Sequence, residues 1–236
     1  MNIILCGYHW TGCQALKLLS SEKNNKIFVY THKSPYYVPS LDKYCRRLSI
    51  EYSLSNISTS ELPFKPDIVC SIYYRNIIQK HIIDACNGQI FNLHPSLLPK
   101  YRGCSSLTWA IINGDRETGF TYHYIDEGCD TGNIIMQKTV AIQDWDTQET
   151  LYLKVMFESM KYFQDVFDLV NKKFTGNTQE GESSYFPRGC PNNGLIDSQW
   201  DKDLKERFIR AMIYPPYPVA RFGEKDIFDI DQLEET

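Results

Sequence analysis

Two short stretches of the chain contain the side-chain types that acyl transfer to an amine requires. The first, Phe91-Asn92-Leu93-His94-Pro95, places an amide and an imidazole two residues apart at the end of an apolar run. The second, residues 119–132, holds the carboxylate of Asp130 in a glycine-flanked loop. An amide can donate a hydrogen bond to a developing oxyanion, while an imidazole or a carboxylate can move a proton. We therefore predict that Asn92, His94 and Asp130 are catalytic.

The predicted strand at residues 89–93 delivers Asn92 and, just beyond it, His94. Their side chains should point to the same face, because residues two apart on a strand lie on the same side. A polarised donor aimed at an oxyanion is typically worth about 3 kcal/mol. A structural interpretation stays open for each residue. Asn92 and His94 could satisfy backbone groups of the loop that follows, and Asp130 could cap a turn. Asp126 is a competing carboxylate, and His123 is interpreted as a hydrogen-bonded core histidine.

The first half of the chain alternates strand-like and helix-like segments. Strands are expected at residues 2–6, 26–31, 67–71, 89–93, 119–126 and 133–142, a turn at 7–12, and helices at 11–19, 77–85, 105–113, 147–173 and 201–211. This order predicts an α/β fold with a Rossmann-like, mostly parallel sheet and helices on both faces. Ligands of such sheets bind beyond the carboxyl ends of strands, where Asn92 and His94 are expected.

The chain is expected to form a catalytic domain over residues 1–180 and a short C-terminal extension over residues 181–236. The extension is too short for a core of its own, so it should pack on the main domain and could contribute to a substrate site and to dimer contacts. The extension is rich in prolines and aromatic residues, which could also serve only to dock it.

Composition excludes several classes of protein. The net charge is -4 and the sequence has no basic block, which argues against a nucleic-acid partner. No apolar run approaches the roughly 18 residues that span a membrane, and the apolar start lacks a cationic leader, so it reads as a strand. The eight cysteines are irregularly spaced, which predicts reduced thiols in a cytoplasmic protein and no zinc site.

In residue type, order and separation, Asn92, His94 and Asp130 resemble the catalytic core of the formyltransferases that use 10-formyltetrahydrofolate. The resemblance implies direct transfer of the formyl group from that co-substrate to a primary amine, with no covalent enzyme intermediate and no metal. The segment from Ser71 to Ile83 resembles the loop that holds the pterin, although Gln79 stands where many members have proline. The residues implied for folate binding are Ser71, Tyr73, Ile77, Ile78, Ile125, Asp126 and Gly128. An amphipathic helix is the alternative for the isoleucines.

The C-terminal extension resembles that of the nucleotide-sugar N-formyltransferases, through residues 185–188, 193–197, 209–211 and 215–218. This branch implies a 4-amino-4,6-dideoxy sugar carried on dTDP or UDP, a homodimer, and a place in the synthesis of lipopolysaccharide O-antigen or another surface polysaccharide. Arginines suit a diphosphate, and aromatic rings can stack on a pyrimidine. The predicted substrate residues are His9, Tyr101, Arg102, Phe186, Arg188, Trp200, Arg210 and Tyr217.

Several other activities share this core. The segment from His94 to Pro99 is close to that of the glycinamide ribonucleotide formyltransferases, but the loop after the first strand lacks their phosphate-binding pattern. A formyltetrahydrofolate hydrolase would need no nucleotide pocket, so the character of the extension argues against it. The tRNA branch carries a further RNA-binding domain, for which the chain has no room.

Overall fold

The computed structural model describes residues 1–233, and the last three residues of the predicted extension lie outside this range. The chain forms two compact units, here called the first and the second unit. The first contains residues 1–94, 121–136 and 158–179, and the second contains residues 95–120, 137–157 and those from 180 onward. The domain boundary expected at residue 180 stays a prediction.

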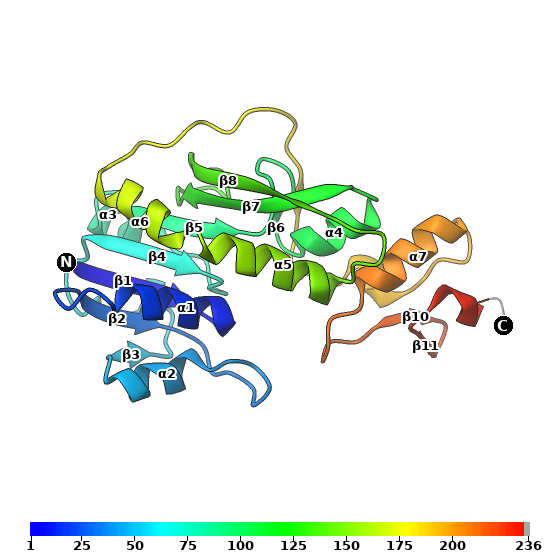
Figure 1. The fold of residues 1–236 in the computed structure, drawn as a ribbon, viewed down its shortest axis with the longest axis horizontal. Coiled ribbons are helices and arrows are strands. Elements are labelled where there is room, and N and C mark those ends of the chain that lie inside the picture. Colours follow the sequence, from blue (N-terminus) through cyan, green and yellow to red (C-terminus); the bar gives the residue numbers. More distant parts are fainter. Residues whose placement is uncertain (234–236) are drawn as a thin grey trace. The chain divides into compact units, whose positions relative to one another are not determined.

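A seven-stranded sheet is the framework of the fold (Figure 1). In spatial order its strands are β3 (Tyr52–Ser53), β2 (Lys26–Tyr30), β1 (Asn2–Gly7), β4 (Ile68–Ile72), β5 (Ile90–His94), β7 (Glu117–Tyr124) and β8 (Ile134–Ala141). The first five pair in parallel, and β7 runs antiparallel to β5. Ile3, Ile4 and Leu5 are fully buried, as expected for a parallel strand covered on both faces. The predicted mostly parallel α/β sheet is confirmed.

Short helices accompany the strands of the first unit. They are α1 (His9–Leu19), α2 (Leu41–Leu48), the 3-10 turn η1 (Ile57–Thr59), α3 (Lys80–Ala85) and α6 (Phe163–Asn171), while α5 (Gln148–Met160) begins in the second unit. A buried apolar cluster around Ile4, Tyr30, Val69 and Ile90 forms part of the core. All eight cysteines are free thiols. Within residues 1–233, no helix combines the length and the apolar character that crossing a bilayer demands.

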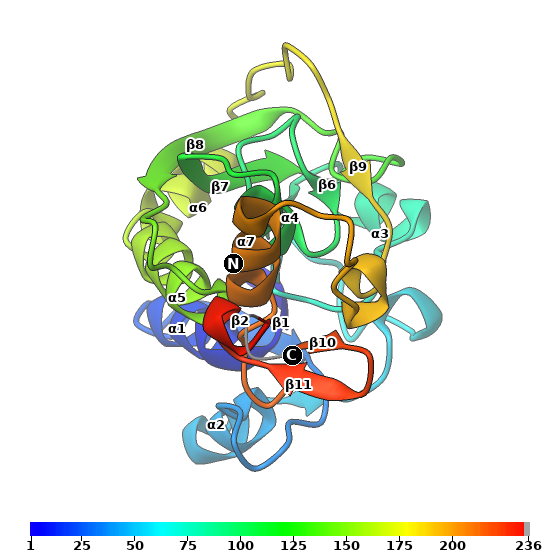
Figure 2. The same cartoon turned by 90° about the vertical axis from the view of Figure 1, so that its right-hand side faces the viewer.

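The second unit contains the C-terminal elements. It includes parts of β7, β8 and α5. Its other elements are β6 (Arg102–Gly103), α4 (Ser106–Ile112), β9 (Tyr185–Phe186), η2 (Pro191–Gly194), α7 (Lys202–Ala211), β10 (Ala220–Phe222), β11 (Lys225–Ile227) and η3 (Ile230–Leu233). Helix α7 packs against α4 (Figure 2). β6 and β9 pair in parallel so closely that a Cβ on Gly103 would lie 2.2 Å from the carbonyl oxygen of Phe186. This pairing joins segments some eighty residues apart in the sequence.

The single helix predicted over residues 147–173 is wrong, because the chain forms two helices there. α5 ends at Met160 and α6 begins at Phe163. The backbone N–H groups of Lys161 and Tyr162 donate to the carbonyls of Glu158 and Ser159, three residues back, which closes tight turns in place of a continuing α-helix. Apolar residues are buried on both sides of the break, so their spacing does not reveal it.

Two other boundaries differ from expectation. The helix predicted over residues 77–85 begins only at Lys80, because Gln79 has extended backbone angles (ψ 162°) and acts as the N-cap. The turn predicted over residues 7–12 is mostly helix, since α1 begins at His9. The residues at 77 and 78 therefore lie in a loop between β4 and α3.

Candidate active site

Strand β5, which pairs in parallel with β4, carries Asn92 and ends at His94, so both residues lie at the carboxyl-terminal edge of the parallel part of the sheet. The two side chains share one face of the strand, while Phe91 and Leu93 are buried on the other. The antiparallel neighbour β7 places His123 opposite Asn92 and Thr121 opposite His94. His94 is 5% exposed, so its imidazole lies almost entirely within the protein.

Asp130 lies between two imidazoles. Its Oδ2 is 3.5 Å from Nδ1 of His94, and its Oδ1 is 3.4 Å from Nε2 of His123. The carboxylate is 14% exposed, which leaves it a limited opening to solvent. The backbone of Asp130 has a positive φ of 55°, a conformation that Asp adopts more readily than most residues. The structure thus brings an amide, two imidazoles and a carboxylate together.

Hydrogen bonds hold the loop around Asp130 without using its carboxylate, which faces the two imidazoles. Nε2 of Gln179 donates to the carbonyl oxygens of Asp130 and Gly132, each at 2.8 Å. Oδ1 of Asp126 accepts from the backbone N–H of Gly128 at 3.1 Å and from the hydroxyl of Thr131 at 2.6 Å. Asp126, the competing carboxylate of the sequence, is therefore the one that closes the turn. Nothing in the sequence identifies the role of Gln179.

His123 was expected to be a hydrogen-bonded core histidine, and the structure shows more. The side chain is 2% exposed, and its Nδ1 is 2.8 Å from the carbonyl oxygen of Tyr124. The other ring nitrogen, Nε2, is 3.2 Å from Nδ2 of Asn92 and faces Asp130. The alternation of the strand could have indicated its face, but its pairing with Asn92 follows from a register that the sequence does not contain.

The segments predicted to hold a pterin lie beside the same core. Ile78 is 7% exposed and belongs to the buried apolar cluster around Ile4. Ile125 is partly buried and packs against the same cluster, whereas Ile77 is 85% exposed. Ser58 fixes the segment, since its hydroxyl donates to the carbonyl of Ile77 at 3.2 Å and accepts from the backbone N–H of Gln79 at 3.0 Å. The helix alternative for Ile77 and Ile78 is wrong, because both precede α3.

Aromatic rings and imidazoles gather where β1, β2 and β4 end. Tyr73, which has a positive φ of 60°, stacks on Tyr8 with ring centroids 6.4 Å apart and meets His9 edge-on at 5.8 Å. His32 stacks on Tyr74 at 4.8 Å. Burial lowers the pKa of both His9 and His32, which favours their neutral forms. The predicted folate residue Tyr73 and the predicted substrate residue His9 are thus neighbours.

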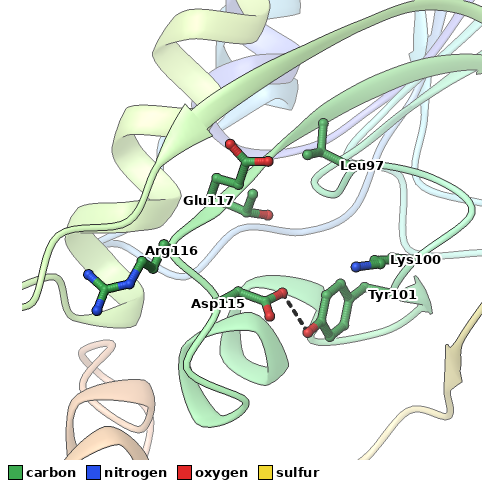
Figure 3. Close-up of a pocket in the computed structure, with 7 residues that line it drawn as sticks. Leu97, Lys100, Tyr101, Asp115, Arg116 and Glu117 are labelled. Atoms are coloured by element: carbon green, nitrogen blue, oxygen red, sulfur yellow. Dashed lines mark hydrogen bonds between the residues drawn. The ribbon is translucent and has the colours of Figure 1, made fainter.

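Tyr101, a predicted substrate residue, lines a cavity of about 150 Å³ in the second unit (Figure 3). The other lining residues are Leu97, Lys100, Asp115, Arg116, Glu117 and Thr118. The Tyr101 hydroxyl donates to Asp115 at 2.7 Å and accepts from Asn113 at 3.0 Å. Burial raises the pKa of Tyr101 to about 12, so the phenol remains protonated at neutral pH.

The remaining predicted substrate residues also belong to the second unit, and several already make structural contacts. The ring of Phe186 stacks on Trp109, with centroids 4.5 Å apart. Trp200 meets Phe208 edge-on at 5.0 Å, and Arg210 donates from Nη1 to the carbonyl of Asp146 at 2.6 Å. Arg188 is exposed, Arg102 forms β6, and Tyr217 is 60% exposed and stacks on Tyr214. Their roles in binding stay predictions.

The amide, two imidazoles and carboxylate at the carboxyl end of β5 are an arrangement suited to acyl transfer. Over the described residues no group of three or more His, Cys, Asp or Glu side chains is placed to hold a metal ion. The chain belongs to the formyl transferase family, whose profile matches residues 18–167. The predicted family is therefore confirmed, and the protein is an enzyme of the transferase class.

Two curated relatives illustrate the similarity, and one of them is named for a sugar substrate. GDP-perosamine N-formyltransferase of Brucella melitensis biotype 1 is 36% identical over 201 residues, covering 83% of this chain and 78% of that protein. The bifunctional polymyxin resistance protein ArnA of Wigglesworthia glossinidia brevipalpis is 32% identical over 228 residues, covering 91% of this chain and 35% of that protein.

Solved structures show the same fold. The N-formyltransferase of Helicobacter canadensis, determined with folinic acid and dTDP-3-aminofucose, superposes with a TM-score of 0.82 at 24% identity, over 97% of this chain and 86% of that one. The sugar 3N-formyl transferase WlaRD, determined with dTDP and 5-N-formyl-THF, has the same TM-score and identity, over 97% and 85%.

Proposed function

We propose that this protein transfers the formyl group of 10-formyltetrahydrofolate to the amine of a nucleotide-linked amino sugar. The observation that carries the proposal is the position of Asp130, whose two carboxylate oxygens face the imidazoles of His94 and His123 beside the amide of Asn92. A proton acceptor and a polarised donor in one place are what formylation of an amine requires.

The residues have separate roles in the proposed reaction. The folate supplies an activated formyl group, and in the net reaction the amine nitrogen gains a bond to the formyl carbon as the carbon–nitrogen bond to the folate breaks. Asn92 and His94 donate hydrogen bonds to the formyl oxygen as it gains negative charge. Asp130 accepts the proton that leaves the amine, and the folate nitrogen gains a proton as it departs, so that the exchange balances. His94 faces Asp130 through its Nδ1 and stabilises the carboxylate, while His123 holds the amide of Asn92.

The residues present fit a folate. A pterin is a planar ring with apolar faces and a polar edge, so it needs an apolar wall and backbone groups within reach. Ile78 and Ile125 supply apolar side chains, and the loop between β4 and α3 is pinned by Ser58 rather than closed into a helix. The turn closed by Asp126 and Gly128 supplies a second ordered stretch of backbone. We propose these segments as the folate site.

The nucleotide of the acceptor is the finer part of the proposal. Our sequence interpretation favours a 4-amino-4,6-dideoxy sugar on dTDP or UDP, while the Brucella relative is named for GDP-perosamine at 36% identity. A GDP-linked sugar is therefore the first acceptor to test, ahead of dTDP- and UDP-linked sugars. The half-buried rings of His9 and Tyr73 at the strand ends offer surfaces on which a base or a sugar can stack.

The test is a mass-spectrometric assay with 10-formyltetrahydrofolate and GDP-, dTDP- and UDP-linked 4-amino sugars. We expect one nucleotide sugar to gain the mass of a formyl group in place of a hydrogen. Glycinamide ribonucleotide and a reaction without any amine serve as parallel arms. Formylation of glycinamide ribonucleotide alone, or release of formate without an amine, would contradict the proposal and point to a purine enzyme or a hydrolase.

We further propose a homodimer in the cytoplasm that serves surface-polysaccharide synthesis. The free state of all eight cysteines supports a reducing compartment. The dimer rests on the sugar N-formyltransferase resemblance. Light scattering coupled to gel filtration should give about twice the 27.5 kDa of one chain, and a mass of 27.5 kDa at working concentrations would contradict it.

A further inference from the structure

Three polar side chains form a row across neighbouring strands of the first unit. Ser71 on β4 pairs in register with Asn92 on β5, and Asn92 pairs with His123 on β7. Side chains of laterally paired residues lie on the same face of a sheet, close enough to interact. The Ser71 hydroxyl is 2.8 Å from Oδ1 of Asn92, and Nδ2 of Asn92 is 3.2 Å from Nε2 of His123. Ser71 and His123 are 4% and 2% exposed.

The chemistry of the row sets the orientation of the Asn92 amide. Nδ1 of His123 lies 2.8 Å from the carbonyl oxygen of Tyr124, which can only accept, so this nitrogen carries a hydrogen. In the neutral ring Nε2 is then an acceptor and needs a donor, which is the amide nitrogen of Asn92. The amide oxygen must therefore face Ser71, whose hydroxyl donates to it. One N–H of the amide binds His123, and the second is left for the reacting oxygen.

We propose that Ser71 is a positioning residue for catalysis, which acts by fixing the orientation of the Asn92 amide. This inference rests on the proposed formyl transfer, and it differs from a folate-binding role for Ser71. A freed amide can rotate by half a turn and present its oxygen, an acceptor, to a formyl oxygen that needs a donor. The acceptor nitrogen of His123 disfavours that orientation at one end of the row, and the hydroxyl of Ser71 holds the amide oxygen by donating to it at the other.

The kinetic test uses Ser71→Ala, which deletes the hydroxyl without adding bulk. Complete loss of an oxyanion donor typically costs about 100- to 1,000-fold in kcat, so loss of its orientation should cost less, about tenfold. The KM for 10-formyltetrahydrofolate should stay within about twofold. Ser71→Thr retains the hydroxyl and should recover most of kcat. Ser159→Ala, which deletes another fully buried hydroxyl of the first unit, is the matched control and should leave kcat unchanged.

Two kinetic outcomes would overturn the inference. A wild-type kcat in Ser71→Ala shows that the amide needs no such anchor. A raised KM for the folate with kcat unchanged shows that Ser71 contacts the folate instead.

A second experiment does not depend on any acceptor, so it separates this inference from the proposed function. Nitrogen-15 NMR of the histidine rings should show neutral His123 with hydrogen on Nδ1 and none on Nε2. In Ser71→Ala the signals of Nε2 and of the Asn92 amide should shift, because the amide loses its fixed orientation. Hydrogen on Nε2 of the wild-type ring, or unchanged signals in the variant, would refute the positioning role even if formyl transfer is found.

Discussion

At the scale of single residues, Asp130 is the group on which the proposed chemistry depends. Replacing it with Asn conserves shape and removes the proton acceptor. General acid–base groups contribute about 100- to 10,000-fold, so we expect Asp130→Asn to lower kcat by at least 100-fold. The affinity for 5-formyltetrahydrofolate, measured by calorimetry, should change little. Steady-state kinetics with the identified acceptor checks the first expectation.

The control for this substitution lies in the same loop. Glu127 is exposed, and its 3.7 Å ion pair with Lys80 is a surface contact of the kind that contributes little. Glu127→Gln should therefore retain wild-type kcat. If Asp130→Asn were as active as Glu127→Gln, the proton acceptor would be another group, and the assignment would be wrong.

Among the elements, the loop that carries Asp130 depends on a glycine for its path. A Cβ built on Gly132 would lie 1.9 Å from the carbonyl oxygen of Tyr124, closer than atoms can approach. Gly132→Ala must displace the loop or the strand, and such overpacking typically costs about 1–3 kcal/mol. We expect a lower melting temperature and a lower kcat, because Asp130 moves with the loop. Differential scanning calorimetry and kinetics measure both.

Gly189→Ala is the matched control for the loop, because a Cβ there would meet no atom within 4 Å. It should leave stability and kcat close to those of the wild type. Equal stability of Gly132→Ala and Gly189→Ala would show that the close approach of this loop to β7 has no energetic consequence.

The start of α5 is stabilised by an ionised aspartate. Burial opposes the charge of Asp146, but a 2.6 Å contact from Lys154, the N–H of Gln143 and the hydroxyl of Thr150 outweigh it and lower the pKa of Asp146 below its usual value. An aspartate whose pKa is lower in the folded state than in the unfolded state stabilises the protein at pH values above its unfolded-state pKa. This stabilisation is lost as the pH falls through the folded-state pKa.

Asp146→Asn should therefore lower the free energy of unfolding at pH 7 by about 1–3 kcal/mol, because it weakens hydrogen bonds to a buried charge while Lys154, 39% exposed, keeps access to water. The difference from the wild type should narrow as the pH falls below about 4, the ordinary pKa of Asp. Urea denaturation at pH 7 and pH 3 measures both values. Asp144→Asn, an exposed neighbour, should match the wild type at both pH values. A difference that stays constant with pH would exclude the charge as the cause.

The sequence predicts the elements better than it predicts their contacts. Alternating apolar segments locate the strands that carry Asn92 and Ser71, because buried parallel strands have a composition of their own. The break between α5 and α6 leaves the apolar stripe unchanged and so has no sequence signal. The place of His123 depends on its register with β5, and the pairing of β6 with β9 joins distant segments. Such contacts arise from tertiary packing, which local patterns do not encode.

At the scale of the whole molecule, the net charge of -4 offers no general attraction to an anionic nucleotide. Recognition must therefore come from particular side chains, and binding should be selective among anions. Ligands that bind only the folded state raise its stability, by about 2.7 kcal/mol at a concentration of 100 times Kd. This relation allows donor and acceptor to be identified separately, without turnover.

We expect 5-formyltetrahydrofolate to raise the melting temperature of the wild type and of Asp130→Asn alike, because Asp130 is not among its predicted binding residues. Among the nucleotides, GDP should raise it more than dTDP or UDP at equal concentration, in line with the Brucella relative. If the two units unfold in separate transitions, the folate should shift only that of the first, which holds all its candidate residues. A larger shift with dTDP or UDP would reverse the order of acceptors, and a shift with tRNA exceeding all nucleotides would contradict a sugar acceptor.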